Sequence, residues 1–239
     1  MKILAIDSSS LVATVAVVQD DIMTAEYTIN HKKTHSQTLL PMIDEIVKMA
    51  EINLEDIDAI AVSGGPGSFT GLRIGSATAK GLGLVWNKVL IHVPTVDAMA
   101  YNLYGTDKLI CPIMDARRSQ TYTGIYEFCD EEFNIVMEQC AISIEELAAK
   151  LNEFGRSVIF VGDGIPVFKE YLDENVMVKH FYAPAHMNRQ RAGAVAVLGQ
   201  KYLIEGKTES AAEHQPEYLR QSQAEREAKQ KDNCWTSVR

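Results

Sequence analysis

Apolar and polar positions along this chain predict two successive series of strands and helices. In the first series we expect strands at 2–8, 11–19 and 24–30, a helix at 36–50, a strand at 57–63, a helix at 70–86, a strand at 88–93 and a helix at 95–104. The second series has strands at 108–115, 120–128 and 133–141, a helix at 143–154, a strand at 157–162, a helix at 166–172, a strand at 176–182 and a helix at 188–205. Each half therefore has the order β-β-β-α-β-α-β-α.

The repeated order predicts an α/β fold built from two tandem halves. Three successive strands favour an antiparallel meander, and the β-α-β crossovers that follow favour parallel additions to the same sheet. We therefore expect a first domain at 1–105, a second domain at 106–215 and a C-terminal tail at 216–239. Two such ribonuclease-H-like halves are similar to the actin, sugar-kinase and heat-shock ATPase superfamily.

The turn between the first two strands is where that superfamily resemblance implies a phosphate site. The superfamily pattern is Asp-x-Gly-Thr, but here the turn is Asp7-Ser8-Ser9-Ser10. A Cβ in place of the glycine keeps the backbone N–H away from a phosphate oxygen. Two interpretations stay open: Asp7, Ser8 and Ser9 satisfy their own turn, or they form a residual phosphate turn. The second turn, 115–119, also has no glycine.

Composition and charge limit the classes of function. With 46% apolar residues in 239, the chain can build a full core, and a net charge of −9 argues against a polyanion as its main contact. The first apolar run, 1–7, is too short for a signal peptide, and no run reaches transmembrane length. The four cysteines have no C-x-x-C spacing and are expected to be free thiols. We therefore predict a cytoplasmic protein without a membrane contact.

A glycine-rich segment, 64–75, links the strand at 57–63 to the helix at 70–86. A glycine-rich turn before a helix N-terminus is a general anion site. The spacing nevertheless excludes the known phosphate motifs. Gly71 follows Gly65 and Gly67 one residue too late for G-x-G-x-x-G, and no G-K-[ST] is present. We predict no cofactor at this loop.

Small residues continue into the helix at four-residue spacing, at Gly71, Gly75, Ala79 and Gly83. Each helical glycine costs about 0.5–1 kcal/mol relative to alanine, and close approach of a neighbouring backbone would offset that cost. The neighbour is either the chain's own sheet or a partner helix. Leucine at Gly75 is expected to abolish partner binding and to leave the fold intact. Arg73, badly placed for the helix dipole, is expected to contact a carboxylate or an anion.

The preceding helix has an apolar stripe that methionines widen to about half of its circumference. A helix that covers its own sheet needs a narrower arc. The stripe indicates either a deeply covered helix or a flank that meets another subunit, for which methionine is well suited. The stripe consists of Leu39, Leu40, Ile43, Ile46, Val47 and Ala50, with Met42 and Met49 beside it.

His31 and His35 are the candidate metal pair, because histidines at i and i+4 on a helix can share a zinc ion. However, a helix that begins at Thr34 or Ser36 leaves His31 outside, and no third ligand or adjacent glutamate completes the set. We therefore predict no metal site and, without an acid–base pair or a Ser-His-Asp arrangement, no catalytic residue.

Several short motifs, spread over nearly the whole chain, carry a family resemblance. They are 3–9 (Ile-Leu-Ala-Ile-Asp-Ser-Ser), 35–43 (His-Ser, then Leu-Leu-Pro-x-Ile), 63–75 (Ser-Gly-Gly-Pro-Gly-Ser-Phe-Thr-Gly-Leu-Arg-Ile-Gly), 79–82, 115–118, 122–126, 162–164 and 216–220. On these motifs the chain resembles the TsaB family of bacterial proteins, also called YeaZ. The glycine-rich run is the most specific of them.

The resemblance implies a non-catalytic subunit of the complex that transfers threonylcarbamoyl to N6 of the tRNA adenosine beside the anticodon. It implies binding to a TsaD-like catalytic paralogue and a TsaE-like ATPase through first-domain helices, which also form homodimers in family members, and contact with tRNA only through the complex. The interface residues are then His35, Ser36, Leu39, Leu40, Ile43, Phe69, Thr70, Gly71, Arg73 and Gly75. The alternatives are a metal-dependent carbamoyltransferase or peptidase that uses His31 and His35, and a weak nucleotide-binding ATPase of the same fold.

Overall fold

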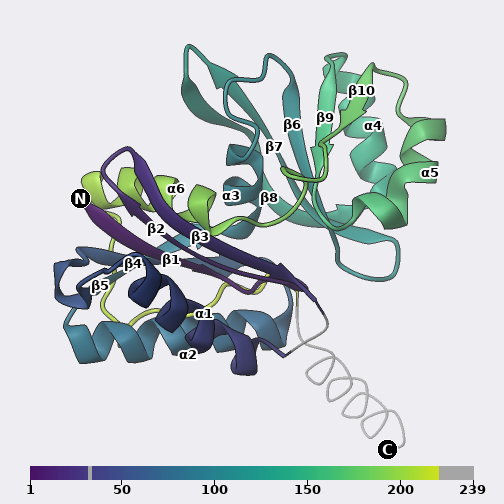
Figure 1. Ribbon diagram of the computed structural model, residues 1–239. Coiled ribbons are helices and arrows are strands. Elements are labelled where there is room, and N and C mark those ends of the chain that lie inside the picture. Colours follow the sequence, from purple (N-terminus) through teal and green to yellow (C-terminus); the bar gives the residue numbers. More distant parts are fainter. Residues whose placement is uncertain (32–33, 221–239) are drawn as a thin grey trace, which may run out of the picture.

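The computed structural model describes residues 1–31 and 34–220 as two successive α/β halves (Figure 1). The first half consists of β1 (Lys2–Asp7), β2 (Val12–Gln19), β3 (Ile22–Asn30), α1 (His35–Met49), a 3-10 turn (Leu54–Asp56), β4 (Ala59–Gly65), α2 (Phe69–Trp86), β5 (Val89–Pro94) and α3 (Thr95–Tyr101). The second consists of β6 (Leu109–Asp115), β7 (Gln120–Cys129), β8 (Glu132–Ser143), α4 (Ile144–Phe154), β9 (Val158–Val161), α5 (Ile165–Asn175), β10 (His180–Tyr182) and α6 (Ala192–Ile204). The predicted α/β class, with two ribonuclease-H-like halves, is confirmed.

Several elements are shorter than the sequence predicts, and two of them are shorter by at least four residues. The strand expected at 176–182 covers only β10, because Val176 still caps α5 through its N–H bond to the carbonyl of Leu172. The helix expected at 188–205 begins at 192, because Arg191 is extended, with φ −137° and ψ 125°. The part of the tail at 221–239, and Cys234 with it, lies outside the described residues, whereas Cys111, Cys129 and Cys140 carry free thiols.

Each half forms one five-stranded sheet, with the orders β3-β2-β1-β4-β5 and β10-β9-β6-β7-β8. In both sheets the first three strands pair antiparallel. β4 and β9 then add in parallel to the first strand of their sheet, and β5 and β10 add in parallel to β4 and β9. The predicted meander and crossovers are therefore both present. The carboxyl ends of β1 and β4 lie side by side, which brings the first turn next to the glycine-rich loop.

The helices form layers around the two sheets (Figure 1). α1 and α2 cover one face of the first sheet, and α4 and α5 cover the outer face of the second sheet. Between the sheets, α6 packs on the first sheet through residues such as Val195 and Leu198, and α3 packs on the second through Val96 and Met99. Each half therefore ends in a helix that packs on the sheet of the other half. Because the helices are exchanged in this way, the packing does not separate two independent domains, and the division at residues 105 and 106 stays a prediction.

A buried carboxylate joins these inner layers. Asp97 of α3 is 4% exposed, and it accepts a hydrogen bond of 2.7 Å from the hydroxyl of Tyr126 in β7. The hydroxyl of Tyr202 in α6 donates to its other oxygen at 3.5 Å. No helix within residues 1–31 and 34–220 has both the length and the apolar content needed to cross a lipid bilayer.

Candidate functional site

The glycine-rich loop between β4 and α2 is pressed against other backbone segments of the same chain. A Cβ on Gly65, whose φ is +128°, would lie 2.3 Å from the carbonyl oxygen of Glu217. A Cβ on Gly71 would lie 2.0 Å from the carbonyl oxygen of Ser8. The Gly65–Pro66 bond is cis, and the Ser68 hydroxyl accepts a hydrogen bond from Gly71 N–H at the start of α2. The close approach that the glycines predict is therefore made within the chain.

The first turn is filled by the chain's own hydrogen bonds. The Ser8 hydroxyl donates to the carbonyl of Gly71 at 2.9 Å, and Ser9 N–H donates to the Asp7 carboxylate at 2.8 Å. Burial raises the pKa of Asp7. Among the described residues, one Asp7 oxygen and the Ser9 hydroxyl have no hydrogen-bond partner. The α2 backbone thus contacts the turn directly, and a residual phosphate turn at these residues stays a prediction.

The inward row of α2 belongs to the fold. A Cβ on Gly75 would lie 2.5 Å from the Ser8 hydroxyl oxygen, and one on Gly83 would lie 2.5 Å from Leu90 Cδ1. Leucine at Gly75 would therefore crowd the Ser8 side chain, and this geometry disfavours the expectation that the substitution leaves the fold intact. The sequence allows either the chain's own sheet or a partner helix as the neighbour of this row. In the structure the neighbour is the chain's own first turn and sheet.

Arg73 contacts an aromatic residue instead of the expected carboxylate or anion. Its Nε donates to the Tyr218 hydroxyl at 3.1 Å, and its guanidinium lies 5.8 Å from the centre of that ring. Phe69 stacks on the same ring, with the two ring centres 4.5 Å apart and the two planes 6° apart. The start of α2 is thereby joined to the segment that precedes residue 221.

The outer faces of α1 and α2 expose apolar side chains. Leu40 is 53% exposed, and Leu84 and Val85 are 68% and 79% exposed. The ten residues predicted for a partner interface divide accordingly: Ser36, Leu40, Thr70 and Arg73 are exposed, His35 and Phe69 are half-buried, and Leu39, Ile43, Gly71 and Gly75 are buried. Sequence analysis missed Leu84 and Val85, although their apolar character at an outward helical position is a usable signal.

The two histidines of the predicted metal pair do not meet a third ligand. His31 is exposed, and His35 Nε2 lies 2.7 Å from the carbonyl oxygen of Ser10. In the described part of the chain, three other side chains, none of them from this pair, lie close enough together to share a metal ion. The geometry of this pair therefore gives no support to a metal-dependent enzyme.

A cleft of about 790 Å³ lies between the two halves, next to the N-termini of α1 and α2. His35 and Thr70 line it from the first half, and Asp163 and Arg189 line it from later in the chain. Burial raises the pKa of Asp163 to about 6, and Arg189 partly opposes that shift. Guanidinium and carboxyl groups together suit a small polar ligand. Sequence analysis noted 162–164 only as a motif and did not identify Arg189.

The turn between β6 and β7 borders this cleft in a strained conformation. Residues 117–119 have φ values of 66°, 58° and 56°, which residues other than glycine rarely adopt. The Asp115 carboxylate accepts a hydrogen bond from Arg117 N–H at 2.8 Å and pairs with its guanidinium at 3.0 Å. Arg220 donates to the carbonyl of Ala116. These contacts hold the turn in place without glycine.

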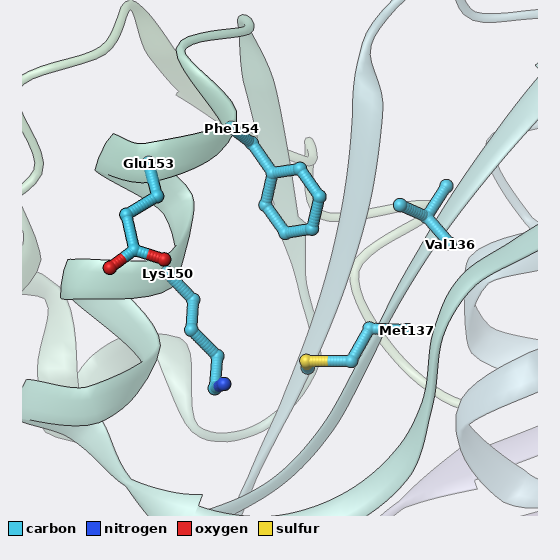
Figure 2. A pocket seen from close by; sticks show the side chains of 5 residues that line it. All are labelled: Val136, Met137, Lys150, Glu153 and Phe154. Atoms are coloured by element: carbon cyan, nitrogen blue, oxygen red, sulfur yellow. The ribbon is translucent and has the colours of Figure 1, made fainter.

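A second, smaller depression of about 320 Å³ lies on the second half (Figure 2). Val136 and Met137 of β8 line one side of it, and Phe154 of α4 lines the other, with Lys150 and Glu153 at its edge. The sequence gives no sign of this depression, since its walls come from two separate elements.

Comparison with known proteins adds a family. The matching family model, described as "TsaD: tRNA N6-adenosine threonylcarbamoyltransferase", covers residues 23–228. The chain is 32% identical to "tRNA threonylcarbamoyladenosine biosynthesis protein TsaB" of Bacillus subtilis, over 94% of this chain and 96% of that protein. It is 28% identical to the protein of the same name from Escherichia coli, also over 94% and 96%.

A solved structure supports the fold. The protein titled "YeaZ from Pseudomonas aeruginosa" superposes with a TM-score of 0.78 at 23% identity, over 91% of this chain and 99% of that one. The shared fold therefore extends over both halves. From the family model and from the identity to the Bacillus subtilis protein over almost its full length, the chain belongs to the TsaB family, also called YeaZ.

Proposed function

We propose that this chain takes part in tRNA threonylcarbamoyladenosine biosynthesis, the process for which its relatives are named, as a non-catalytic cytoplasmic subunit. In this proposal it binds a TsaD-like catalytic paralogue, engages a TsaE-like ATPase together with it, and reaches tRNA only through that complex. The observation that carries the proposal is the apolar outer face of α1 and α2, where Leu40, Leu84 and Val85 are more than half exposed. The same face can also pair two copies of this chain.

The outward row of α2 supports a helical partner. Ala77, Gly81 and Val85 recur at four-residue spacing, and all three are exposed. A Cβ on Gly81 would meet nothing within 4 Å. This row therefore leaves room for the close approach of a second helix, and the apolar side chains beside it would be removed from water on binding. The inward row at residues 71, 75, 79 and 83 is needed by the fold itself.

The non-catalytic role is supported by the first turn. In place of a glycine that would let a phosphate approach the backbone, Ser8 is bonded to the carbonyl of Gly71, and Ser9 N–H is bonded to Asp7. The Ser8 hydroxyl and the Ser9 N–H are thereby engaged within the chain, whereas the Ser9 hydroxyl has no partner among the described residues. We therefore assign the reaction itself to the partner and a supporting surface to this chain.

Omission from a reconstituted reaction tests the function. The purified chain, a TsaD-like protein, a TsaE-like ATPase and the enzyme that supplies the threonylcarbamoyl donor would be mixed with unmodified tRNA. Leaving out this chain is expected to lower the rate of threonylcarbamoyl transfer at least ten-fold. Modified nucleoside would be measured by mass spectrometry after digestion of the tRNA. An unchanged rate would overturn the proposed function.

Aspartate in place of Leu84 is expected to weaken binding to the TsaD-like partner at least ten-fold. The side chain is 68% exposed in the free chain, so the fold tolerates the change, whereas the complex would have to bury an unpaired charge. Calorimetric titration with the partner would measure the dissociation constant. Met177→Asp is the matched control, because Met177 is 83% exposed on the second half. Equal losses in both variants would contradict the assignment of the surface to α2.

A further inference from the structure

Residues 207–218, here called the C-terminal strap, return from α6 to the first sheet. Glu209 pairs with Leu90 of β5 through two backbone hydrogen bonds of 2.9 Å, and Glu217 N–H donates to the carbonyl of Gly64 at 2.7 Å. Lys80 of α2 donates to the carbonyl of His214 at 2.9 Å. The strap is therefore fixed on both the β5 edge and the glycine-rich loop.

Two histidines and a glutamate meet where this strap packs against β5. His92 of β5, Glu209 and His214 each offer one ligand atom, and these atoms lie within 4.8 Å of one another. The His214 side chain is 0% exposed, its Nδ1 lies 2.5 Å from Glu209 Oε1, and its ring centre lies 5.9 Å from that of His92. The His92 ring occupies the space of a side chain at Gly64. Distant segments thus bring three metal-binding side chains together.

One buried atom of the group, His214 Nε2, has no hydrogen-bond partner among the described residues. A buried polar atom without a partner is costly, and native structures normally satisfy it by a hydrogen bond, a water molecule or an ion. The hydrogen bond from His214 to Glu209 explains Nδ1 but leaves Nε2 unexplained. A cation near both imidazoles would use the lone pair of a neutral histidine.

The donor set selects the metal. Two imidazole nitrogens and one carboxylate oxygen suit zinc, which binds histidine at about 2.0–2.1 Å in tetrahedral geometry and therefore holds neighbouring ligand atoms about 3.3 Å apart. Zinc at His214 Nε2 requires the Glu209 carboxylate to leave Nδ1 and turn toward the ion, because the two ring nitrogens point to different sides of the imidazole. The spacing of about 3.3 Å is therefore reached from the upper limit of 4.8 Å only with a rearrangement of the Glu209 side chain. Glu217 Oε2, which lies 4.0 Å from His92 Nε2, can supply a fourth oxygen.

We propose that His92, Glu209 and His214 form a structural zinc site that fastens the C-terminal strap to β5 and to the glycine-rich loop. The site is separate from the proposed partner surface, because it lies on the strap and β5 and not on the outward row of α2. It also differs from the pair His31 and His35, which the sequence alone suggests. The proposal does not depend on the proposed function.

Zinc titration of the full chain tests the proposal. The chain would be stripped of metal with a chelator and titrated with Zn²⁺ by calorimetry, with Co²⁺ as a spectroscopic probe of tetrahedral geometry. We expect one saturable site, tetrahedral Co²⁺ bands and a rise in Tm on Zn²⁺ addition. His92→Gln and Glu209→Gln, neither of which removes a fully buried side chain, are expected to weaken Zn²⁺ binding at least ten-fold and to abolish the rise in Tm.

Two histidine variants serve as controls. His186→Gln changes an exposed histidine outside the group, and His31→Gln changes the alternative pair. Both are expected to bind Zn²⁺ as the wild type does. The proposal is overturned if the wild type shows no saturable Zn²⁺ binding, if His92→Gln and Glu209→Gln bind as tightly as the wild type, or if His31→Gln alone loses the ion.

Discussion

Alanine in place of Gly71 is expected to lower the free energy of unfolding by about 3 kcal/mol. Its Cβ would lie 2.0 Å from the carbonyl oxygen of Ser8, so one of two backbone segments must move. The same two residues are joined by the hydrogen bond from the Ser8 hydroxyl to the Gly71 carbonyl, which such a movement would stretch. Overpacking of a filled core costs about 1–3 kcal/mol, and the upper end applies because both contacting groups are backbone.

Gly81→Ala on the same helix is the matched control. Gly81 is exposed, and a Cβ there would meet nothing within 4 Å, so only the helix preference changes. Because alanine has a higher helix propensity than glycine, Gly81→Ala should raise the free energy of unfolding by about 0.5–1 kcal/mol. Urea unfolding would measure both variants, and a loss of about 3 kcal/mol should also lower Tm by roughly 6–12 °C. If Gly71→Ala unfolds within about 0.5 kcal/mol of the wild type, which is near the error of the method, the tight contact with Ser8 is not real.

This pair of glycines shows how far the sequence could predict the site. The four-residue spacing predicts a row where another backbone comes close, and the structure shows such a contact at Gly71, whereas Gly75 lies against the Ser8 side chain. Spacing cannot tell which backbone that is, because Ser8 is brought there by the pairing of β1 with β4. Two of the residues predicted for the partner surface, Gly71 and Gly75, accordingly lie on the inward row, whereas the exposed row contains Gly81 and Val85.

The order of elements was predictable, because strands and helices have different hydrophobic periods. The exchange of α3 and α6 between the sheets was not, since an apolar helical face does not identify the sheet that it covers. The cluster around His92 and His214 was missed for a related reason. A histidine pair at i and i+4 is visible in the sequence, but two histidines on separate segments meet only after the strap has folded back on β5.

The buried carboxylate of Asp97 is expected to make the protein less stable as the pH rises from about 4 to 7. Burial raises the pKa of Asp97 from its ordinary value near 3.8 to about 6, and Glu138 and Glu217 add to the shift. The hydrogen bonds from Tyr126 and Tyr202 oppose it. The folded chain therefore holds this proton more tightly than the unfolded chain. This contribution to stability is fully present below pH 3.8 and is lost as the pH rises through about 6.

The substitution Asp97→Asn isolates this effect. The amide side chain keeps an oxygen that can accept the hydrogen bond from Tyr126, but it carries no charge. A shift from 3.8 to about 6 corresponds to about 3 kcal/mol, so Asp97→Asn is expected to gain up to that amount relative to the wild type between pH 4 and 7. Urea unfolding at half-unit pH intervals would measure the difference.

Two other aspartates help to interpret the difference in stability between Asp97→Asn and the wild type. Asp163, whose pKa burial also raises to about 6, should leave a residual slope in the Asp97→Asn variant. The hydrogen bond from Lys108 lowers the pKa of Asp107, which is fully exposed, so Asp107→Asn should show no such gain in this pH range. A stability difference between Asp97→Asn and the wild type that stays constant from pH 4 to 7 would mean that Asp97 is ionised throughout. The contact between α3, β7 and α6 would then have to admit water, because burial could no longer hold the proton on the carboxyl group.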